Sequence, residues 1–328
     1  MNSQNTALTL VGLQERRPWP PKRVSLALQG GGSFGAFTAG VLDRLLDEPA
    51  LEFDAISGSS AGAVNAVLLA SGMISGGRAE AQARLRGFWN RMSASAAATS
   101  LAASAIGMAL SPVLNSLSPY QFNPFNIDPL RDALAAEVDF AKLRAEAPMK
   151  LLIGATRVSD GELRIFEASE LTIEMVLASA CLPLVHHAVE VAGEPYWDGG
   201  YAGNPPLIPL ARASDASDLL IVRTTPTVSG RLPKTKSEIA RRLERIQFNA
   251  TLNAELEALK LGIRLRATPK LRRLRIGMIS AQDEFAGLED ESQADLGREF
   301  LDRLWRSGRD AVEIWLEQSS PAGRGRAA

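Results

Sequence analysis

The chain has one cysteine, two histidines and almost no excess of charge, and each shortage excludes a class of protein. Cys181 alone can form neither a disulfide within the chain nor a cysteine-based metal site. The 36 lysines and arginines are matched by 37 aspartates and glutamates, which gives a formal net charge of −1. Because nucleic-acid binding needs clustered basic residues to neutralise phosphates, this balance argues against a nucleic-acid partner.

A long hydrophobic run is also missing from the start of the chain. Residues 1–22 are polar and contain prolines, without the continuous apolar segment that a secretory signal requires. We therefore expect a cytoplasmic protein. The remaining length is enough for one large domain, with or without a helical appendage.

One basic stretch, residues 264–275, departs from the even charge balance. We interpret it as a solvated helix end followed by a strand. The alternative is a contact with anionic lipid head groups.

Apolar runs that stop at glycines or turn residues alternate with segments of helical periodicity. The runs predict strands at 24–29, 53–57, 150–156, 162–166, 188–191, 219–224 and 274–279. The periodic segments predict helices at 36–46, 61–71, 128–137, 172–180, 236–265 and 291–317. This alternation predicts a layered α/β fold.

The long helix predicted at 236–265 carries stripes of apolar residues: Ile239, Leu243, Ile246, Leu252, Leu256 and Leu259. Packing against the core explains such stripes as well as dimerisation does. We favour core packing, and the oligomeric state stays open.

No charged residue occurs between Arg91 and Asp128, and the segment passes from Ala/Ser-rich to strongly apolar. A transmembrane helix is one interpretation, but Pro112, Pro119 and many small polar residues argue against it. A buried helix followed by a loop is another. The interpretation we favour is a cover, or lid, over the active site at residues 93–127.

The first chemical motif is Gly30-Gly31-Gly32-Ser33-Phe34-Gly35, between a predicted strand and a predicted helix. Consecutive glycines leading into a helix leave backbone N–H groups that can bind an oxyanion, with Gly31 and Gly32 as the best donors. The same motif fits a dinucleotide-binding turn, with Glu52 or Asp54 as the ribose-binding acid. However, Asp54 opens its strand instead of ending it.

The second motif, Gly58-Ser59-Ser60-Ala61-Gly62, lies between a predicted strand and a small-residue helix. A Gly-x-Ser-x-Gly elbow allows a serine side chain to project from a strained backbone. Ser60 is therefore a candidate nucleophile. Without further support, the motif is equally typical of a tight turn rich in small residues.

A serine nucleophile needs a base, and the third motif, Asp198-Gly199-Gly200, supplies one. We expect Asp198 to lie in a flexible loop, shielded from water by Trp197, with a pKa high enough to accept the serine proton. His186 and His187 both precede Asp198, so a histidine late in the chain is excluded. A Ser-His-Asp triad in another order is the alternative, although adjacent histidines are more often structural.

Together, in this order and at this spacing, the three motifs resemble those of the patatin-like phospholipases. The resemblance covers residues 24–210, and implies a Ser60–Asp198 dyad, an oxyanion hole at Gly30, Gly31 and Gly32, and no metal or cofactor. It also implies a three-layer α/β/α sandwich around a mixed, mostly parallel sheet. Gly35, Gly58, Gly62, Gly199 and Gly200 complete the motifs. Asn65 and the segment 178–183 also agree with the family pattern.

Two positions depart from the family pattern. Family members often have Asp before the glycines and a basic residue before the last of them, whereas this chain has Gln29 and Phe34. Without that cation, a phosphate head group has no evident partner at this place.

The resemblance suggests four parts: an N-terminal extension at 1–22, a catalytic domain at 23–225, a helical and strand part at 226–318 packed on it, and a disordered tail at 319–328. The expected activity is hydrolysis of carboxylic esters in lipid-like substrates through an acyl-enzyme. A polyester depolymerase using the same dyad, a dinucleotide-binding protein and a non-catalytic lipid-binding protein are the alternatives. For such a substrate we also expect peripheral contact with a membrane or lipid surface.

Overall fold

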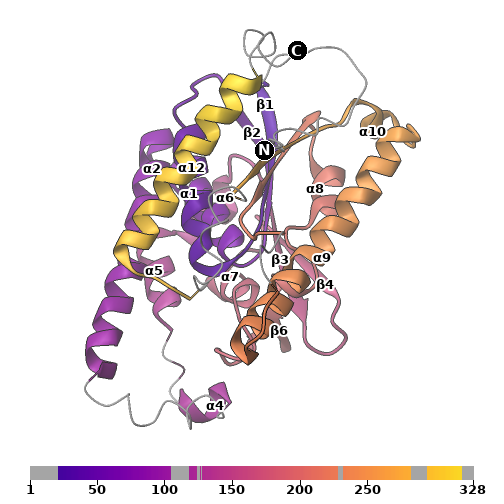
Figure 1. The fold of residues 1–328 in the computed structure, drawn as a ribbon. Helices are drawn as coiled ribbons and strands as arrows, with labels where there is room; N and C mark the ends of the chain where they lie inside the picture. The colour runs from indigo at the N-terminus through magenta and orange to yellow at the C-terminus, as the bar shows by residue number, and fades with distance from the viewer. Residues whose placement is uncertain are drawn as a thin grey trace, which may run out of the picture.

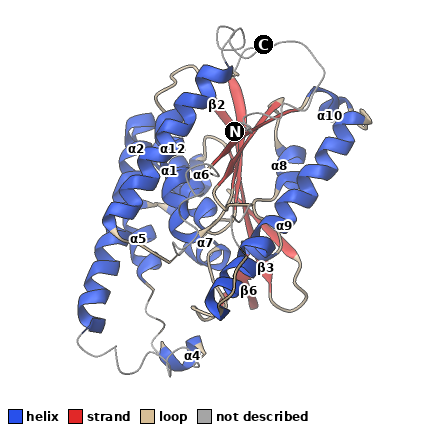
Figure 2. Cartoon of the chain, in the orientation of Figure 1, coloured by secondary structure: helices blue, strands red, loops and turns tan. Residues whose placement is uncertain are grey.

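A mixed sheet of eight strands lies between two layers of helices (Figures 1 and 2). The computed structural model describes residues 21–104, 118–123, 126, 128–227, 232–281 and 294–319. The strands are β1 (Arg23–Leu28), β2 (Glu52–Gly58), β3 (Lys150–Arg157), β4 (Leu163–Glu167), β5 (Val189–Val191), β6 (Glu194–Asp198), β7 (Asp218–Arg223) and β8 (Arg275–Ser280). Their order is β5-β6-β3-β2-β1-β7-β8, and β4 also pairs with β3.

The central strands are parallel, and β4, β5 and β6 add antiparallel pairs at one side. Side chains of β1 alternate between the two faces, so that Leu26 and Leu28 join one hydrophobic core and Ala27 joins the other. Burial on both faces is typical of a parallel sheet covered by helices. The predicted fold class, an α/β/α sandwich with a mostly parallel sheet, is confirmed.

One helical layer contains α1 (Gly35–Leu45), α2 (Ala61–Ser104), α5 (Pro129–Glu137) and α12 (Arg298–Ser319), and the other contains α8 (Leu207–Ala213), α9 (Lys236–Arg264) and α10 (Pro269–Arg273) (Figure 1). The shorter helices are α4 (Pro119–Phe122), α6 (Phe140–Glu146) and α7 (Ile173–Ser179). Two 3₁₀ turns, η1 (Gly32–Phe34) and η2 (Gly199–Tyr201), belong to the glycine motifs.

The C-terminal helix α12 packs closely on α1. A Cβ atom at Gly40 would lie 2.0 Å from the carbonyl oxygen of Trp305, and one at Gly308 would lie 2.2 Å from that of Phe37. The two glycines therefore let the helix backbones approach each other. The predicted start of this helix at residue 291 is wrong, because residues 294–297 are not helical and α12 begins at Arg298.

Several other elements differ from the sequence-based prediction, among them the short helices α4 and α10, which were not predicted. Helix α2 was predicted to end at residue 71, but helical structure resumes after a kink at Gly76 and Gly77 and continues to Ser104; Gly77 has a φ of 72°, which favours glycine. Strand β6 and helices α6 and α8 are short and gave no periodic signal. In β6, Pro195 also argues against a strand on sequence alone.

The expectation that the apolar stripes of α9 pack into the core holds for only half of the helix. Leu252, Leu256 and Leu259 are buried in the core on the face of the sheet covered by α8. Ile239, Leu243 and Ile246 in the N-terminal half are exposed. Core packing therefore does not explain these three residues.

Helix α2 includes the start of the segment predicted to be a lid. Residues 93–104 continue this helix, whereas residues 105–117, 124–125 and 127 lie outside the described part of the chain. The lid at 93–127 thus stays a prediction, as do the extension at 1–22 and the disordered tail. Among the described residues, no helix is both long enough and apolar enough to cross a membrane.

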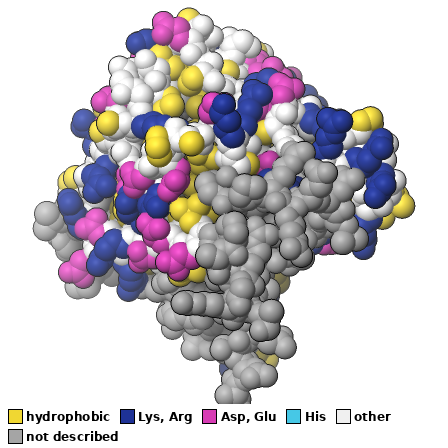
Figure 3. Space-filling model, turned by 90° about the horizontal axis from the view of Figure 1, so that it is seen from above, with side chains coloured by type: hydrophobic (Ala, Val, Ile, Leu, Met, Phe, Trp, Pro, Cys, Tyr) yellow, Lys and Arg dark blue, Asp and Glu magenta, His cyan; other side chains and the backbone are white. Residues whose placement is uncertain are grey.

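The basic stretch at 264–275 forms the end of α9 and the start of β8, as the first interpretation predicted, and also the short helix α10, which it did not predict. Lys and Arg side chains gather over α10 at the right-hand edge of the face seen from above (Figure 3). The face seen in Figure 3, with the basic residues of α10, lies at the opposite end of the sheet from the N-terminus of α9 (Figure 1).

The register of β3 determines which strand ends meet. Ala155 pairs with Arg164 of β4 and with Asp198 of β6, so β4 and β6 lie on opposite edges of β3. Strand β2 also pairs with β3 on the edge opposite β4, because Ile153 of β3 pairs with both strands. The partner of Ile153 on β2 is Gly58, the last residue of that strand. Strands β2 and β6 therefore share one edge of β3 and point toward each other. Their ends are separated by two residues of β3, or about 7 Å.

Candidate active site

Ser60 lies two residues after the end of β2, at the tight turn into α2. Its φ is 55°, a left-handed conformation that is unusual for a residue with a side chain. Its backbone N–H points to Ser179, donating to both the carbonyl oxygen and the side-chain Oγ at 3.0 Å. The predicted strain at Ser60 is confirmed, and Ser179 at the end of α7 helps to hold the turn.

Glycines on both sides of Ser60 make this turn sterically possible. A Cβ atom at Gly58 would lie 2.6 Å from the backbone of Gly62, and one at Gly62 would lie 2.0 Å from the carbonyl oxygen of Leu28. Distances this short leave no room for any side chain. The two glycines therefore let β2 and α2 fold back closely on each other and on β1.

Asp198 is the last residue of β6 and is fully buried. Its backbone N–H donates to the carbonyl oxygen of Cys181 at 2.8 Å, and its carbonyl oxygen accepts from the Thr156 hydroxyl at 2.8 Å. The expectation of a flexible loop is wrong, because both backbone groups are fixed within the sheet region. Trp197 is not the expected shield either, since neighbouring side chains on a strand point to opposite faces.

The carboxyl group of Asp198 has one fixed and one free oxygen. Oδ1 accepts a hydrogen bond from the backbone N–H of Gly200 at 2.7 Å. Oδ2 is buried and has no hydrogen-bond partner of its own within the described part of the chain. The Ser60 side chain lies near enough to lower the pKa of this carboxyl. The second oxygen is thus available to accept the Ser60 proton.

Burial dominates the pKa of Asp198. Loss of solvent disfavours the carboxylate and raises its pKa from 3.8 to about 7, and the charge of Glu244 on α9 acts in the same direction. The hydrogen bond from the Gly200 N–H and the nearby Ser60 side chain oppose this rise of the pKa. A carboxyl group with a pKa near neutrality can both accept and return a proton at physiological pH.

Gly199 and Gly200 serve close packing instead of the predicted loop flexibility. A Cβ atom at Gly199 would lie 2.1 Å from the carbonyl oxygen of Gly154, the β3 residue between the ends of β2 and β6. A Cβ atom at Gly200 would lie 2.6 Å from the ring of Phe248 on α9. Sequence reasoning missed Gly154, because a single glycine in a strand carries no motif.

We expect Gly199→Ala to destabilise the fold by about 3 kcal/mol, since the added methyl group meets a backbone oxygen that cannot move independently. Thermal unfolding of the purified variant measures the effect. Gly262→Ala is the matched control: its Cβ would meet only the flexible end of Leu271 at 2.9 Å, within a helix that favours alanine. Equal melting temperatures for the two variants would contradict the packing role of Gly199.

The glycine loop after β1 lies against Ser60. A Cβ atom at Gly30 would lie 2.6 Å from the Cβ of Ser60. The N–H of Gly30 already donates to Asn204 Oδ1 at 2.8 Å, so this amide is not free to bind an oxyanion here. The amides of Gly31 and Gly32 have no such acceptor among the described residues. These two are accordingly the better candidate donors of the three glycines predicted.

Two buried amide side chains hold the loop in position. Gln29 Oε1 accepts from the backbone N–H groups of Thr224 and Thr225 at 3.0 Å, which joins the ends of β1 and β7. Asn204 Nδ2 donates to the carbonyl oxygen of Phe248 at 3.2 Å. Because Asn204 Oδ1 accepts from the N–H of Gly30, this residue joins the glycine loop to α9. Gln29 therefore has a structural role, and Asn204 is a site residue that sequence reasoning missed.

Phe34, the second departure from the family pattern, also has a structural role. Phe34 is fully buried, and its ring lies edge-on to Phe300 of α12, with centroids 6.2 Å apart. Asn65 donates from Nδ2 to the carbonyl oxygen of Gly35 at 2.9 Å, and accepts from the Trp89 indole at 3.2 Å. The last glycine of the motif is thereby fixed to α2.

The two histidines serve other contacts. His187 stacks on Tyr120 of α4, with centroids 4.2 Å apart, and its Nε2 lies 3.1 Å from the carbonyl oxygen of Pro119. Burial lowers the pKa of His186. Neither histidine is among the groups that set the pKa of Asp198. This geometry gives no support to a Ser-His-Asp arrangement.

The acids required by a dinucleotide site lie far from the glycine loop along the sheet. Asp54 is near the start of β2, where it forms an ion pair with Arg23 and accepts from the backbone N–H of Asp215 at 2.6 Å. Glu52 is exposed at the same end. The glycine loop follows the opposite end of β1, so neither acid can hold a ribose bound at this loop.

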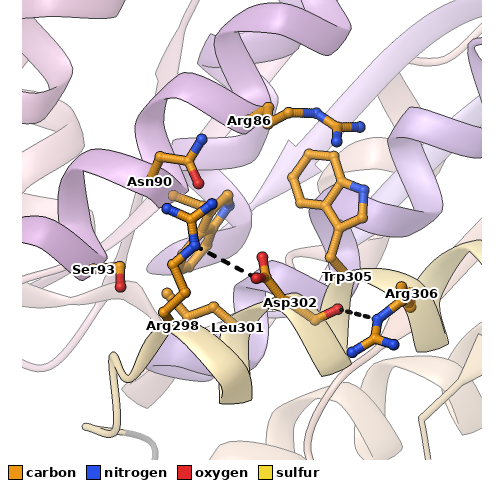
Figure 4. Close-up of a pocket in the computed structure, with 9 residues that line it drawn as sticks. Arg86, Asn90, Ser93, Arg298, Leu301, Asp302, Trp305 and Arg306 are labelled. Atoms are coloured by element: carbon orange, nitrogen blue, oxygen red, sulfur yellow. Dashed lines mark hydrogen bonds and ion pairs between the residues drawn. The ribbon is translucent and has the colours of Figure 1, made fainter.

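A separate pocket of about 340 Å³ lies between α2 and α12 (Figure 4). Trp89 and Trp305 line it, and its charged groups have partners: Arg298 lies 3.5 Å from Asp302, and Arg86 lies over the Trp305 ring at 5.0 Å. None of the predicted site residues lines this pocket. In the described ranges, no three His, Cys, Asp or Glu side chains gather into a metal-binding group.

Comparisons with known proteins agree with the motifs. The sequence model of the patatin-like phospholipase family matches residues 26–211, more than half of the chain. The uncharacterized protein YjjU of Escherichia coli K12 is 26% identical over 221 residues, which are 64% of this chain and 54% of YjjU. The chain thus spans about half the length of this curated relative.

Two solved structures are similar over most of the chain. VipD from Legionella pneumophila aligns with a TM-score of 0.47 and 15% identity, over 91% of this chain and 67% of VipD. The type III effector ExoU of Pseudomonas aeruginosa aligns with a TM-score of 0.39 and 16% identity, over 92% of this chain and 54% of ExoU.

Proposed function

Because the chain belongs to the patatin-like phospholipase family, we propose that it is a lipid acyl hydrolase that cleaves carboxylic esters with Ser60 as nucleophile and Asp198 as general base. The observation that carries the proposal is the meeting of β2 and β6 on one edge of β3. This arrangement brings a strained serine turn close to a buried carboxyl group with a raised pKa.

The proposed reaction has two steps. In the first, Asp198 Oδ2 accepts the proton of Ser60 as Oγ attacks the ester carbonyl, and the amides of Gly31 and Gly32 stabilise the oxyanion. The tetrahedral intermediate collapses, the ester C–O bond breaks, and the leaving alkoxide receives the proton held by Asp198. In the second step Asp198 takes a proton from a water molecule as it attacks the acyl-enzyme, the bond between the acyl carbon and Ser60 Oγ breaks, and Asp198 returns the proton to Oγ as the carboxylic acid leaves.

The proposed substrate class is an ester next to an apolar acyl chain, which phospholipids, lysophospholipids, acylglycerols and intracellular polyesters such as polyhydroxybutyrate share. We propose phospholipid or lysophospholipid as the first candidates, on the family description alone. The polyester depolymerase stays the alternative for the same dyad.

Hydrolysis of nitrophenyl esters of increasing acyl length, together with release of fatty acid from phosphatidylcholine and lysophosphatidylcholine, tests this function. We expect kcat/KM to rise with acyl length up to a limit set by the site, because each buried methylene adds favourable transfer free energy. Release of hydroxyacid from polyhydroxybutyrate without activity on lipids would favour the alternative. No hydrolysis of any of these esters would contradict the proposed function.

A further inference from the structure

The N-terminal half of α9 carries an apolar stripe that no part of the described chain covers. Ile239, Leu243 and Ile246 are 43%, 61% and 49% exposed. Their spacing of four and three residues places them on one face of the helix. We call these three residues the α9 stripe. A continuous apolar face on a surface helix is typical of a binding surface.

The stripe is bordered by positive charge. Residues 232–247 contain five basic and two acidic residues. At 100° per residue, Lys236 and Arg242 lie about 60° to either side of the stripe. Arg242 donates to the carbonyl oxygen of Thr227 at 3.2 Å, a contact that leaves its charge unneutralised. An apolar face flanked by basic residues is the pattern of a helix that lies in the interface of an anionic membrane.

The position of the stripe relates it to the candidate active site. Phe248, which follows the stripe by two residues, lies edge-on to Tyr201 of η2, with centroids 5.4 Å apart. Its carbonyl oxygen accepts from Asn204, which also holds the glycine loop. At 100° per residue Phe248 lies on the face of α9 opposite the stripe, so a surface bound to the stripe would lie about 10 Å, one helix diameter, from the two segments that carry Asp198 and Gly30.

Other exposed apolar residues lie at the same end of the molecule. Helix α4 and the start of α9 are both at the lower end in Figure 1. Tyr120 of α4 is exposed, and its stacking on His187 joins α4 to the segment after α7, where Leu184 is 84% exposed. Several elements near the carboxyl ends of the strands thus present apolar side chains to solvent.

We propose that the α9 stripe, flanked by Lys236 and Arg242, docks the protein on an anionic phospholipid surface and brings the Ser60 site to its substrate. The inference rests on the proposed function and names the partner of the same site. The stripe residues enter the acyl boundary, and the basic side chains remain at the level of the head groups.

Sedimentation with lipid vesicles tests the docking. We expect the Ser60→Ala protein to bind vesicles of phosphatidylcholine mixed with phosphatidylglycerol, and the additional pair Leu243→Glu and Ile246→Glu to reduce the bound fraction at least about tenfold. Leu261→Glu is the matched control, since Leu261 is 49% exposed on the C-terminal half of the same helix. This control should bind like the parent protein.

A charge variant tests the choice of lipid. We expect Lys236→Gln with Arg242→Gln to lose several-fold in binding to vesicles that contain phosphatidylglycerol, and to lose the preference over pure phosphatidylcholine. Equal binding of this variant and its parent to both vesicles would overturn the anionic preference.

Hydrolysis of a soluble short-chain ester separates failure of docking from failure of the function. With Ser60 intact, the stripe variant should hydrolyse this ester at the parental rate, and phosphatidylglycerol vesicles at a rate at least about tenfold lower. Unchanged vesicle binding by the stripe variant overturns the docking and leaves the hydrolase intact. A parent dimer that the stripe variant dissociates, without a change in vesicle binding, would assign the stripe to self-association instead.

Discussion

Ser60→Ala and Asp198→Asn are each expected to reduce kcat for ester hydrolysis by at least about 10³-fold, with the double variant little worse than either single one. The alanine removes the atom that forms the acyl-enzyme. The asparagine keeps the shape of the side chain but cannot accept the serine proton. Because nucleophile and base act in one step, loss of either removes the whole contribution of the pair. Steady-state kinetics on a soluble ester measure these values.

The control for the dyad is the double variant His186→Ala and His187→Ala, which should retain most of its activity on the soluble ester. His187 contributes a stacking contact with Tyr120, so its loss is expected to affect stability more than kcat. Loss of activity in the histidine variant, with activity retained in Asp198→Asn, would assign the base to a histidine. Full activity in Ser60→Ala would show that the nucleophile is another residue.

Protonation of Asp198 is expected to control both activity and stability. As a base it must be ionised, and burial raises its pKa to about 7. The parental kcat/KM should therefore fall about tenfold for each pH unit below this value and level off above it. A pH profile on the soluble ester measures this effect. Asp160→Asn, at an exposed turn, should leave the profile unchanged. A flat parental profile between about pH 5 and pH 8 would contradict the assigned base.

The same pKa gives the sign of the stability effect. The folded protein holds the Asp198 proton more tightly than the unfolded chain, whose carboxyl titrates near 3.8. Between these two pKa values the folded state binds more protons, so the contribution of Asp198 to stability decreases as pH rises from about 4 to about 7. Below this window, where the carboxyl is protonated in both states, there is no penalty.

Asp198→Asn should consequently melt several degrees higher than the parent at about pH 8, because the neutral amide avoids burial of a charge. The difference should disappear near pH 4. Thermal unfolding of both proteins across this range measures it. A lower melting temperature for the variant at high pH would indicate that hydrogen bonds to the carboxylate outweigh the cost of its burial.

Much of the candidate site can be predicted from local sequence, because the chemistry depends on short glycine motifs. The Gly-x-Ser-x-Gly pattern predicts a strained serine, since only glycine fits where Gly58 and Gly62 approach their neighbours. The alternation of strands and helices likewise predicts the layered fold. These features depend on residues that are close together in the chain, and so they leave a local signal.

Tertiary structure decided the features that depend on distant segments. Asp198 meets Ser60 because β2 and β6 pair with the same edge of β3, a register that no local pattern encodes. The raised pKa of Asp198 comes from its full burial. The hydrogen bond that fixes Gly30 is accepted by Asn204, 174 residues away in the chain. The exposure of the α9 stripe, too, depends on where the helix extends beyond the core. The sequence by itself thus determined the candidate reactive groups and their local backbone, whereas the packing of distant strands determined how close these groups lie and how deeply they are buried.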